Sequence, residues 1–212
     1  MGLLDGLLVV SLEQAVAAPF VSSRLADAGA RVIKIERVEG DFARNYDDVV
    51  QGHSAYFVWL NRGKESIAMD LRQPSEVSLL KSMLDKSDVL IENFKTGSLQ
   101  KIGLDLTEIR KENPKLITCS ISGYGTQGKW ADMKAYDLLI QAETAIASLT
   151  GSADEPGRVG VSIADIAAGM YSHSAVLEAL IARGISGCGR HIEVSLFDAL
   201  ADWMAVPLLW QD

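Results

Sequence analysis

Short apolar runs alternate with segments whose apolar residues recur at helical spacing, and this alternation extends along most of the chain. The first forty residues show it most clearly. A continuous apolar run over 7–12 predicts a strand buried on both faces. A helix is expected to begin at Pro19, since proline lacks the N–H that a first helical turn leaves unpaired, and to end before Gly29. Residues 31–36 predict the next strand, so the chain is expected to open with a βαβ unit.

The same two patterns repeat toward the C-terminus. Asp105 is followed three residues later by Glu108, the capping-box pattern of a helix start, and Pro114 is expected to end that helix. Ser195 and Asp198 mark the last helix in the same way. Further strands are predicted over 66–71, 88–92, 116–122 and 191–195, and further helices over 74–86, 136–150 and 165–183, with a turn at Gly184, Gly187 and Gly189. This spacing predicts an α/β fold with a Rossmann-like, doubly wound and mostly parallel sheet.

The last part of the chain is strongly apolar, from Trp203 to Trp210. A helix with so apolar a surface is expected to be buried. Two alternatives stay open for it. Either it closes the core of this domain, or it packs against sequence that lies beyond this chain.

Composition and charge narrow the classes of partner. The formal net charge of −8 argues against nucleic acid, because an acidic chain repels a phosphate backbone. Cys119 and Cys188 are too few for a disulfide framework and have no metal-ligand spacing around them, so no metal is expected. No cation precedes Arg24, unlike in a signal peptide, and no apolar run approaches membrane-spanning length. These features indicate a cytoplasmic protein without a membrane partner.

Two familiar patterns carry little weight here. Residues 123–128 match the GxGxxG pattern after a predicted strand, but a dinucleotide site needs a helix to begin there and none is indicated, so we interpret the segment as a glycine-rich loop.

The histidines His53, His173 and His191 do not cluster. His173 lies between two serines, yet successive residues on a helix point in different directions, so a Ser-His-Asp triad is not supported.

Asp165 has two interpretations. Aspartate is among the best N-cap residues, and a cap at the start of the predicted helix is the simpler explanation. The alternative is a carboxylate nucleophile at the edge of the sheet where open α/β folds bind ligands, with small residues beside it that let a bulky substrate approach. Cations also recur near predicted strand ends, either as scattered surface charge or as contacts for an anionic ligand: Arg37, Arg62, Lys64, Lys95, Lys101 and Lys134.

Several motifs in one order carry a family resemblance across the whole chain. They are residues 4–12, Ala18-Pro-Phe20, 25–36, Gly40-Asp41 with Arg44, 60–64, 66–71, Glu92-Asn-Phe94, 122–125, 161–165 and 194–199. In this order they make the chain resemble the class III CoA-transferases, which include formyl-CoA transferase and carnitine CoA-transferase, and to which α-methylacyl-CoA racemase is related. The resemblance covers the N-terminal half of such proteins only.

The resemblance implies roles for particular residues. Asp165 falls on the catalytic aspartate, and Val16 and Ala17 fall on the loop that lines the active site. Val16 stands where formyl-CoA transferase has a glutamine, which argues against formyl or oxalyl specificity. The remaining positions that the resemblance assigns to coenzyme A binding are Arg37, Met69, Asn93, Phe94, Lys101, Lys134 and Tyr136.

The implied activity moves coenzyme A from an acyl-CoA to a small carboxylic acid through an aspartyl anhydride and an aspartyl-CoA thioester, without a metal. A racemase is the first alternative. Its matching residue just before Asp137 is a histidine, whereas here it is Tyr136, and tyrosine is a poor general base near neutral pH. A non-catalytic CoA-binding fragment that needs a separate C-terminal half is the second alternative.

The resemblance also implies a domain organisation. Residues 1–212 correspond to the N-terminal, large CoA-binding α/β domain, and the family's small domain and C-terminal return segment are absent from this sequence. Family members form interlocked homodimers, so a homodimer is expected.

Overall fold

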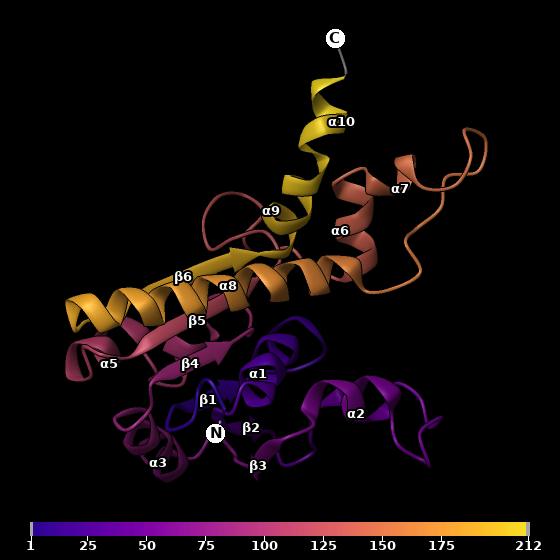
Figure 1. The fold of residues 1–212 in the computed structure, drawn as a ribbon. Helices are drawn as coiled ribbons and strands as arrows, with labels where there is room; N and C mark the ends of the chain where they lie inside the picture. The colour runs from indigo at the N-terminus through magenta and orange to yellow at the C-terminus, as the bar shows by residue number, and fades with distance from the viewer. Residues whose placement is uncertain (1, 211–212) are drawn as a thin grey trace.

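Six parallel strands form one sheet in the computed structural model, which describes residues 2–210 (Figure 1). The sheet order is β3-β2-β1-β4-β5-β6, and every neighbouring pair is parallel. The strands are β1 (Leu8–Leu12), β2 (Arg31–Glu36), β3 (Lys64–Ala68), β4 (Val89–Glu92), β5 (Ile117–Ser122) and β6 (His191–Ser195). This is the strand order of a doubly wound Rossmann-like sheet, so the predicted fold class is confirmed.

Helices cover both faces of this sheet. The long helix α8 lies beside α1 on one face, and α3 and α5 lie on the other (Figure 1). The helices are α1 (Ala17–Asp27), α2 (Ala55–Asn61), α3 (Pro74–Leu84), α4 (Ser98–Lys101), α5 (Leu106–Glu112), α6 (Asp137–Glu143), α7 (Ile146–Leu149), α8 (Ile163–Ser186), α9 (Leu196–Ala201) and α10 (Ala205–Leu209), with short 3-10 turns η1 (Phe42–Asn45) and η2 (Asp202–Met204).

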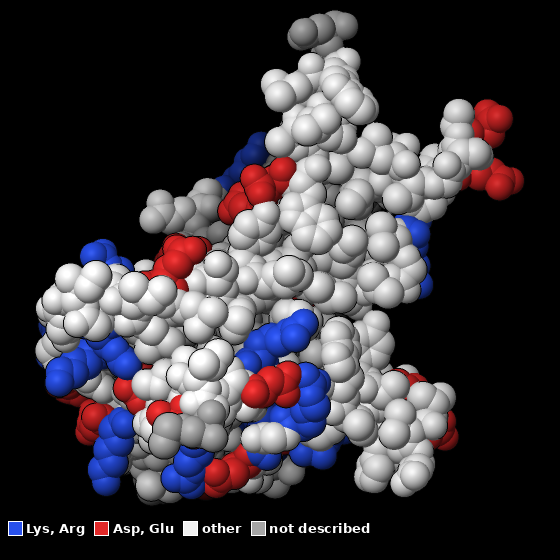
Figure 2. All heavy atoms as spheres, in the orientation of Figure 1, with Lys and Arg blue, Asp and Glu red and all other residues white. Residues whose placement is uncertain are grey.

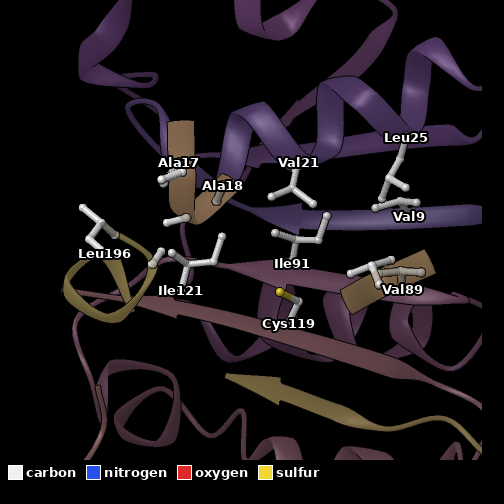
Figure 3. Close-up of a cluster of buried hydrophobic side chains, with 14 of the residues drawn as sticks. Val9, Ala17, Ala18, Val21, Leu25, Val89, Ile91, Cys119, Ile121 and Leu196 are labelled. Carbon is white, nitrogen blue, oxygen red and sulfur yellow. The ribbon is translucent and has the colours of Figure 1, made fainter. Parts of the chain in front are cut away.

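The four inner strands β2, β1, β4 and β5 are buried on both faces, as expected for a parallel sheet, whereas the edge strands β3 and β6 are largely exposed. On one face, Val9 and Ile91 lie under Val21 and Leu25 of α1, as Figure 3 shows. Neighbouring strand residues point the other way, and Val10 belongs to the cluster under α3 and α5. The alternation along β1 thus builds two cores from one five-residue strand.

Several predicted boundaries were wrong by a few residues. The first helix begins at Ala17, so that Pro19 is its third residue, still within the turn whose N–H groups are unpaired. The third strand covers Lys64–Ala68 and not 66–71, because its pairing with β2 begins at Lys64. The long helix continues through Gly184 and ends at Gly187, whose φ of 74° is the left-handed conformation that glycine adopts without strain.

The segment 136–150 was predicted as one helix and forms two. Ala145 lies between α6 and α7 with a φ of 61°, a left-handed conformation that ends a right-handed helix. The sequence contains no glycine or proline there that would have indicated the break. Sequence patterns also missed η1 and α2, which are too short to show helical periodicity.

The apolar end of the chain does not close the core, so the first of the two alternatives for it is wrong. Leu209 and Trp210 are 78% and 79% exposed, whereas Met204 is buried. Helix α10 projects away from the sheet, and Figure 2 shows few charged side chains around it. Among residues 2–210 no helix combines the length and the apolar character needed to cross a membrane.

Gly169 in α8 lies close against α1. A Cβ atom at this position would lie 2.8 Å from Cδ1 of Phe20 and 3.1 Å from the carbonyl oxygen of Ala17. We therefore expect Gly169→Ala to destabilise the fold by about 1–3 kcal/mol through overpacking, measured by urea unfolding. Gly184→Ala is the matched control, because a Cβ there meets no atom within 4 Å and alanine favours the same helix by about 0.5–1 kcal/mol. Equal effects of the two substitutions would contradict this packing argument.

Candidate active site

A cavity of about 700 Å³ opens at the carboxyl edge of the sheet. It lies beyond β1 and β4, where the strand order reverses direction, and open α/β sheets bind ligands at such a point. Asn93 joins the two loops that leave these strands. Its Nδ2 donates to the Gln14 carbonyl oxygen at 2.8 Å, and its Oδ1 accepts from the Gln14 N–H at 3.0 Å.

Asp165 lies on the wall of this cavity, on the first turn of α8. Its interpretation as an N-cap was wrong, because Ser162 occupies the N-cap position and Asp165 is the third helical residue. The N–H of Ala164 is bound instead by Oδ1 of Asp137 at 2.7 Å. Within residues 2–210 no hydrogen bond engages the Asp165 carboxylate, so its oxygens are available to a ligand.

The surroundings of Asp165 disfavour its charged form. Burial, and secondarily the negative charge of Asp137, raise the pKa of Asp165 to about 7. Both influences act in the same direction, because burial removes water from the carboxylate and a like charge repels it. Groups with strongly perturbed pKa values in a cavity are candidates for chemistry.

The start of α8 is held by two polar residues of α6. Gln141 is buried, and its Nε2 donates to Oδ2 of Asp137 at 2.7 Å. Its Oε1 accepts from the N–H of Val159 at 2.8 Å, in the segment that leads into α8. Asp137 and Gln141 therefore fix the position of the helix turn that carries Asp165. Sequence reasoning missed this function, and the only signal was their spacing of four residues, which places both on one helical face.

A buried ion network supports the loop that leads into α1 and ends at its N-cap residue, Val16. Nζ of Lys34 lies 2.7 Å from Oδ2 of Asp41, and both side chains are almost completely buried. Oδ1 of Asp41 accepts from the N–H of Ala15, which has a φ of 63° in the left-handed region. The network thus holds a backbone conformation that costs about 1–3 kcal/mol for a residue other than glycine.

Lys64 also belongs to this network, and its predicted position near a strand end was wrong. It was grouped with the cations near strand ends, but it begins β3 and its side chain is buried. Its Nζ lies 2.7 Å from Oε1 of Glu13, which is fully buried. Lys64 therefore binds protein groups and is not available to an anionic ligand.

Aromatic side chains form another wall of the cavity. Tyr46 follows η1 and Tyr56 belongs to α2, and their rings meet edge to face with centroids 5.8 Å apart. The Tyr56 hydroxyl lies 3.1 Å from Oγ of Ser162 at the start of α8. These two short elements, absent from the sequence prediction, therefore complete the cavity beside Asp165.

The structure brings most of the predicted site residues together. The same cavity is lined by Val16, Ala17, Asn93, Phe94, Lys134, Tyr136 and Asp165. A neighbouring cavity of about 460 Å³ is lined by Arg37, Met69 and, again, Phe94, so the Phe94 side chain borders both. Lys101 lines neither cavity. It is the last residue of α4, and the nearby residues Ser98 and Ile102 line the second cavity.

No helix begins at the glycine-rich loop of residues 123–128, because the next helix begins only at Asp137. This agrees with the sequence analysis. Among the described residues, no group of three His, Cys, Asp or Glu side chains is placed to hold a metal ion.

The sequence profile of CoA-transferase family III matches residues 4–212. The chain belongs to this family. The match extends over nearly the whole sequence and confirms the resemblance that the ordered motifs indicated.

Relatives of this family III chain agree with the assignment. A protein named succinate–glutarate CoA-transferase from Agrobacterium fabrum is 42% identical over 92% of this chain and 51% of its own length. An acetyl-CoA:oxalate CoA-transferase from Acetobacter aceti is 42% identical over 98% of this chain and 54% of its own length. The chain therefore spans about half the length of the relatives it matches.

A solved family structure has the same fold. The crystal structure of a CaiB/BaiF family protein from Brucella suis matches with a TM-score of 0.92 and 43% sequence identity. The match covers 97% of this family III chain and 56% of that protein.

Proposed function

We propose that this family III chain carries the nucleophile and the CoA-binding wall of a CoA-transferase, and that Asp165 is the nucleophile. The observation that carries the proposal is the Asp165 carboxylate itself. It lines a cavity large enough for an acyl group and has a pKa raised to about 7 by burial. A desolvated carboxylate that meets its substrate in a fixed position reacts far faster than one in water.

The proposed reaction exchanges partners at Asp165. An oxygen of its carboxylate attacks the thioester carbon of an acyl-CoA, the C–S bond breaks, and a mixed anhydride and CoA thiolate result. The thiolate then attacks the aspartyl carbon, which releases the first acid as a carboxylate and leaves an aspartyl-CoA thioester. The acceptor acid reverses both steps, so atoms and charge balance without another reactant.

Helix positions support stabilisation of the oxyanions in these steps. Val16 and Ala17 lie at the start of α1, and Asp165 lies on the first turn of α8. Both helices therefore direct N-terminal peptide dipoles toward the cavity, where negative charge develops during thioester attack.

The two cavities suggest a path for coenzyme A. Phe94 lines both, so we place the pantetheine arm across its side chain, with the reactive sulfur near Asp165. Arg37 at the end of β2, Lys101 on α4 and Lys134 supply cations for the phosphates. Met69 in the second cavity and Tyr136 in the first offer apolar surface to the nucleotide and the arm.

We propose a short dicarboxylic acid as the second substrate. The relatives described above are named for succinate and glutarate, and for oxalate, all of which are dicarboxylic acids. Val16 in place of the glutamine of formyl-CoA transferase favours an acid longer than oxalate. Residues 1–212 then serve as the N-terminal part of the large domain, in a homodimer of the family kind.

Mass spectrometry of the intact protein after incubation with succinyl-CoA tests this function. We expect an aspartyl-CoA adduct at Asp165, which hydroxylamine converts into a hydroxamate with release of free CoA. The Asp165→Asn variant should show no adduct and still bind CoA.

Other outcomes would replace the proposal. CoA binding without an adduct would indicate a non-catalytic CoA-binding fragment. Exchange of the Cα proton of a 2-methylacyl-CoA in deuterated water, without an adduct, would indicate a racemase.

A further inference from the structure

Arg158 is a cation on the wall of the Asp165 cavity to which the reaction above gives no function. Two lysines share this wall. Lys95 forms an ion pair with Asp132, with 3.1 Å between Nζ and Oδ1, and Lys134 is assigned to coenzyme A in our proposal. Arg158 forms no ion pair with any residue between positions 2 and 210, and its side chain is exposed.

The backbone on both sides of Arg158 is fixed. On one side, the N–H of Gly157 donates to the carbonyl oxygen of Thr150 at 2.8 Å. On the other side, Gln141 accepts from the N–H of Val159 at 2.8 Å and donates to its carbonyl oxygen at 3.3 Å. Gln141 is buried, so this anchor is rigid. An exposed cation on an anchored backbone loses less freedom on binding an anion than one on a mobile loop.

Arg158 is placed to act at a distance from the reacting carboxylate. It precedes Asp165 by seven residues, and both line the same cavity. Burial and Asp137 are the influences on the pKa of Asp165, and both raise it, so the carboxylate is not neutralised by a neighbouring cation. The positive charge of Arg158 therefore serves a different part of the substrate.

A guanidinium group suits a carboxylate because two of its N–H groups can bind both carboxylate oxygens in one plane. We propose that Arg158 binds the distal carboxylate of a dicarboxylic substrate while its other end reacts at Asp165. This inference rests on the proposed function and adds the residue that selects dicarboxylic acids over monocarboxylic acids. Because the transfer is reversible, donor acyl group and acceptor occupy the same cavity, so Arg158 binds the free carboxylate of either.

Calorimetric titration of the CoA-saturated protein with succinate and with butyrate tests the inference. The two acids have the same chain length and differ in one carboxylate. We expect the wild-type protein to bind succinate about 10–100-fold more tightly, the value of one charge-assisted contact. Arg158→Gln should abolish the preference, and Arg158→Lys should retain part of it, since lysine keeps the charge without the planar fork. Lys129→Gln, which removes an exposed charge outside the cavity, should leave the preference unchanged.

Three results would overturn the inference. They are equal affinities of the wild-type protein for the two acids, an unchanged preference in Arg158→Gln, and a loss confined to CoA affinity, which would assign Arg158 to the cofactor. The aspartyl adduct with succinyl-CoA is measured without an acceptor acid. Its formation together with any of these results would leave the transferase proposal standing and reject the function of Arg158, whereas its absence would reject the transferase.

Discussion

Asp165→Asn should lower the rate of CoA transfer by about 10⁴-fold or more, because an amide cannot form the anhydride or the thioester on which the proposed reaction depends. Asparagine has nearly the same shape, so the cavity and the binding of CoA should be preserved. Steady-state transfer between succinyl-CoA and a second acid measures the rate, and fluorescence titration measures CoA affinity. Residual transfer within tenfold of the wild-type rate would assign the nucleophile to another residue.

The same residue should impose a pH dependence on both activity and stability. The carboxylate must be ionised to attack, so transfer should increase as pH rises through about 7. For stability, the folded pKa lies above the unfolded value of about 3.9, so ionisation opposes folding. The contribution of neutral Asp165 is complete below about pH 4 and is lost as pH rises through 7.

Asp165→Asn should therefore be more stable than the wild-type protein at pH 8, by about 2 kcal/mol after allowance for partial exposure, and equally stable near pH 4. Urea unfolding at the two pH values measures this difference. A variant that is less stable at both would show that the Asp165 carboxylate contributes to the fold. The expected combination of higher stability and lost activity is typical of residues retained for chemistry.

Lys34→Met should destabilise the protein by about 3–5 kcal/mol, because it leaves Asp41 as an unpaired buried charge. Methionine matches the length of the lysine stem, so the loss is mainly electrostatic. Since Asp41 also holds the N–H of Ala15, the loop before α1 should shift, and transfer should decrease in addition. Chemical unfolding and transfer assays measure the two effects.

Arg31→Met provides the matched control on the same strand. Arg31 pairs with Glu65 at 2.7 Å, the same distance as in the Lys34–Asp41 pair, but the Arg31 side chain is 63% exposed and that of Lys34 only 1%. Water already solvates the exposed pair, so its loss should change stability little. Similar destabilisation by the two substitutions would mean that burial does not decide the effect.

The sequence predicted most of the sheet because a buried strand can be recognised from its own residues. A parallel strand buried on both faces is a short apolar run, and the four inner strands, which have this pattern, were predicted to within a residue or so. The edge strand β3 was predicted over 66–71 because its residues are mostly exposed, so no apolar run marks its start at Lys64. The break between α6 and α7 depends on the left-handed conformation of Ala145, and nothing in the local sequence indicated it.

The site was predictable only as far as motif resemblance reached. The resemblance singled out Asp165, which the structure places on the cavity wall, whereas the residues that support it were not predicted. Asp137 contacts Ala164 across 27 positions of sequence, and Asp41 contacts Ala15 across 26. In the sequence, Asp41, Asp137 and Gln141 cannot be distinguished from ordinary surface residues, because their partners become neighbours only in the folded chain. The polar contacts that position a site arise from tertiary structure, and single-sequence patterns do not encode them.

The close contact at Gly169 has a consequence for how this cavity can change over evolution. Phe20 and Ala17 on α1 lie directly against α8, so the wall with Val16 and the wall with Asp165 form one rigid piece. New acids of different length cannot be accommodated by separating these helices. We expect substrate range to diversify through the shorter elements that pack beside this piece, which are η1, α2 and the segment before α8. Changes there alter the volume of the cavity while the Asp165 carboxylate stays in place.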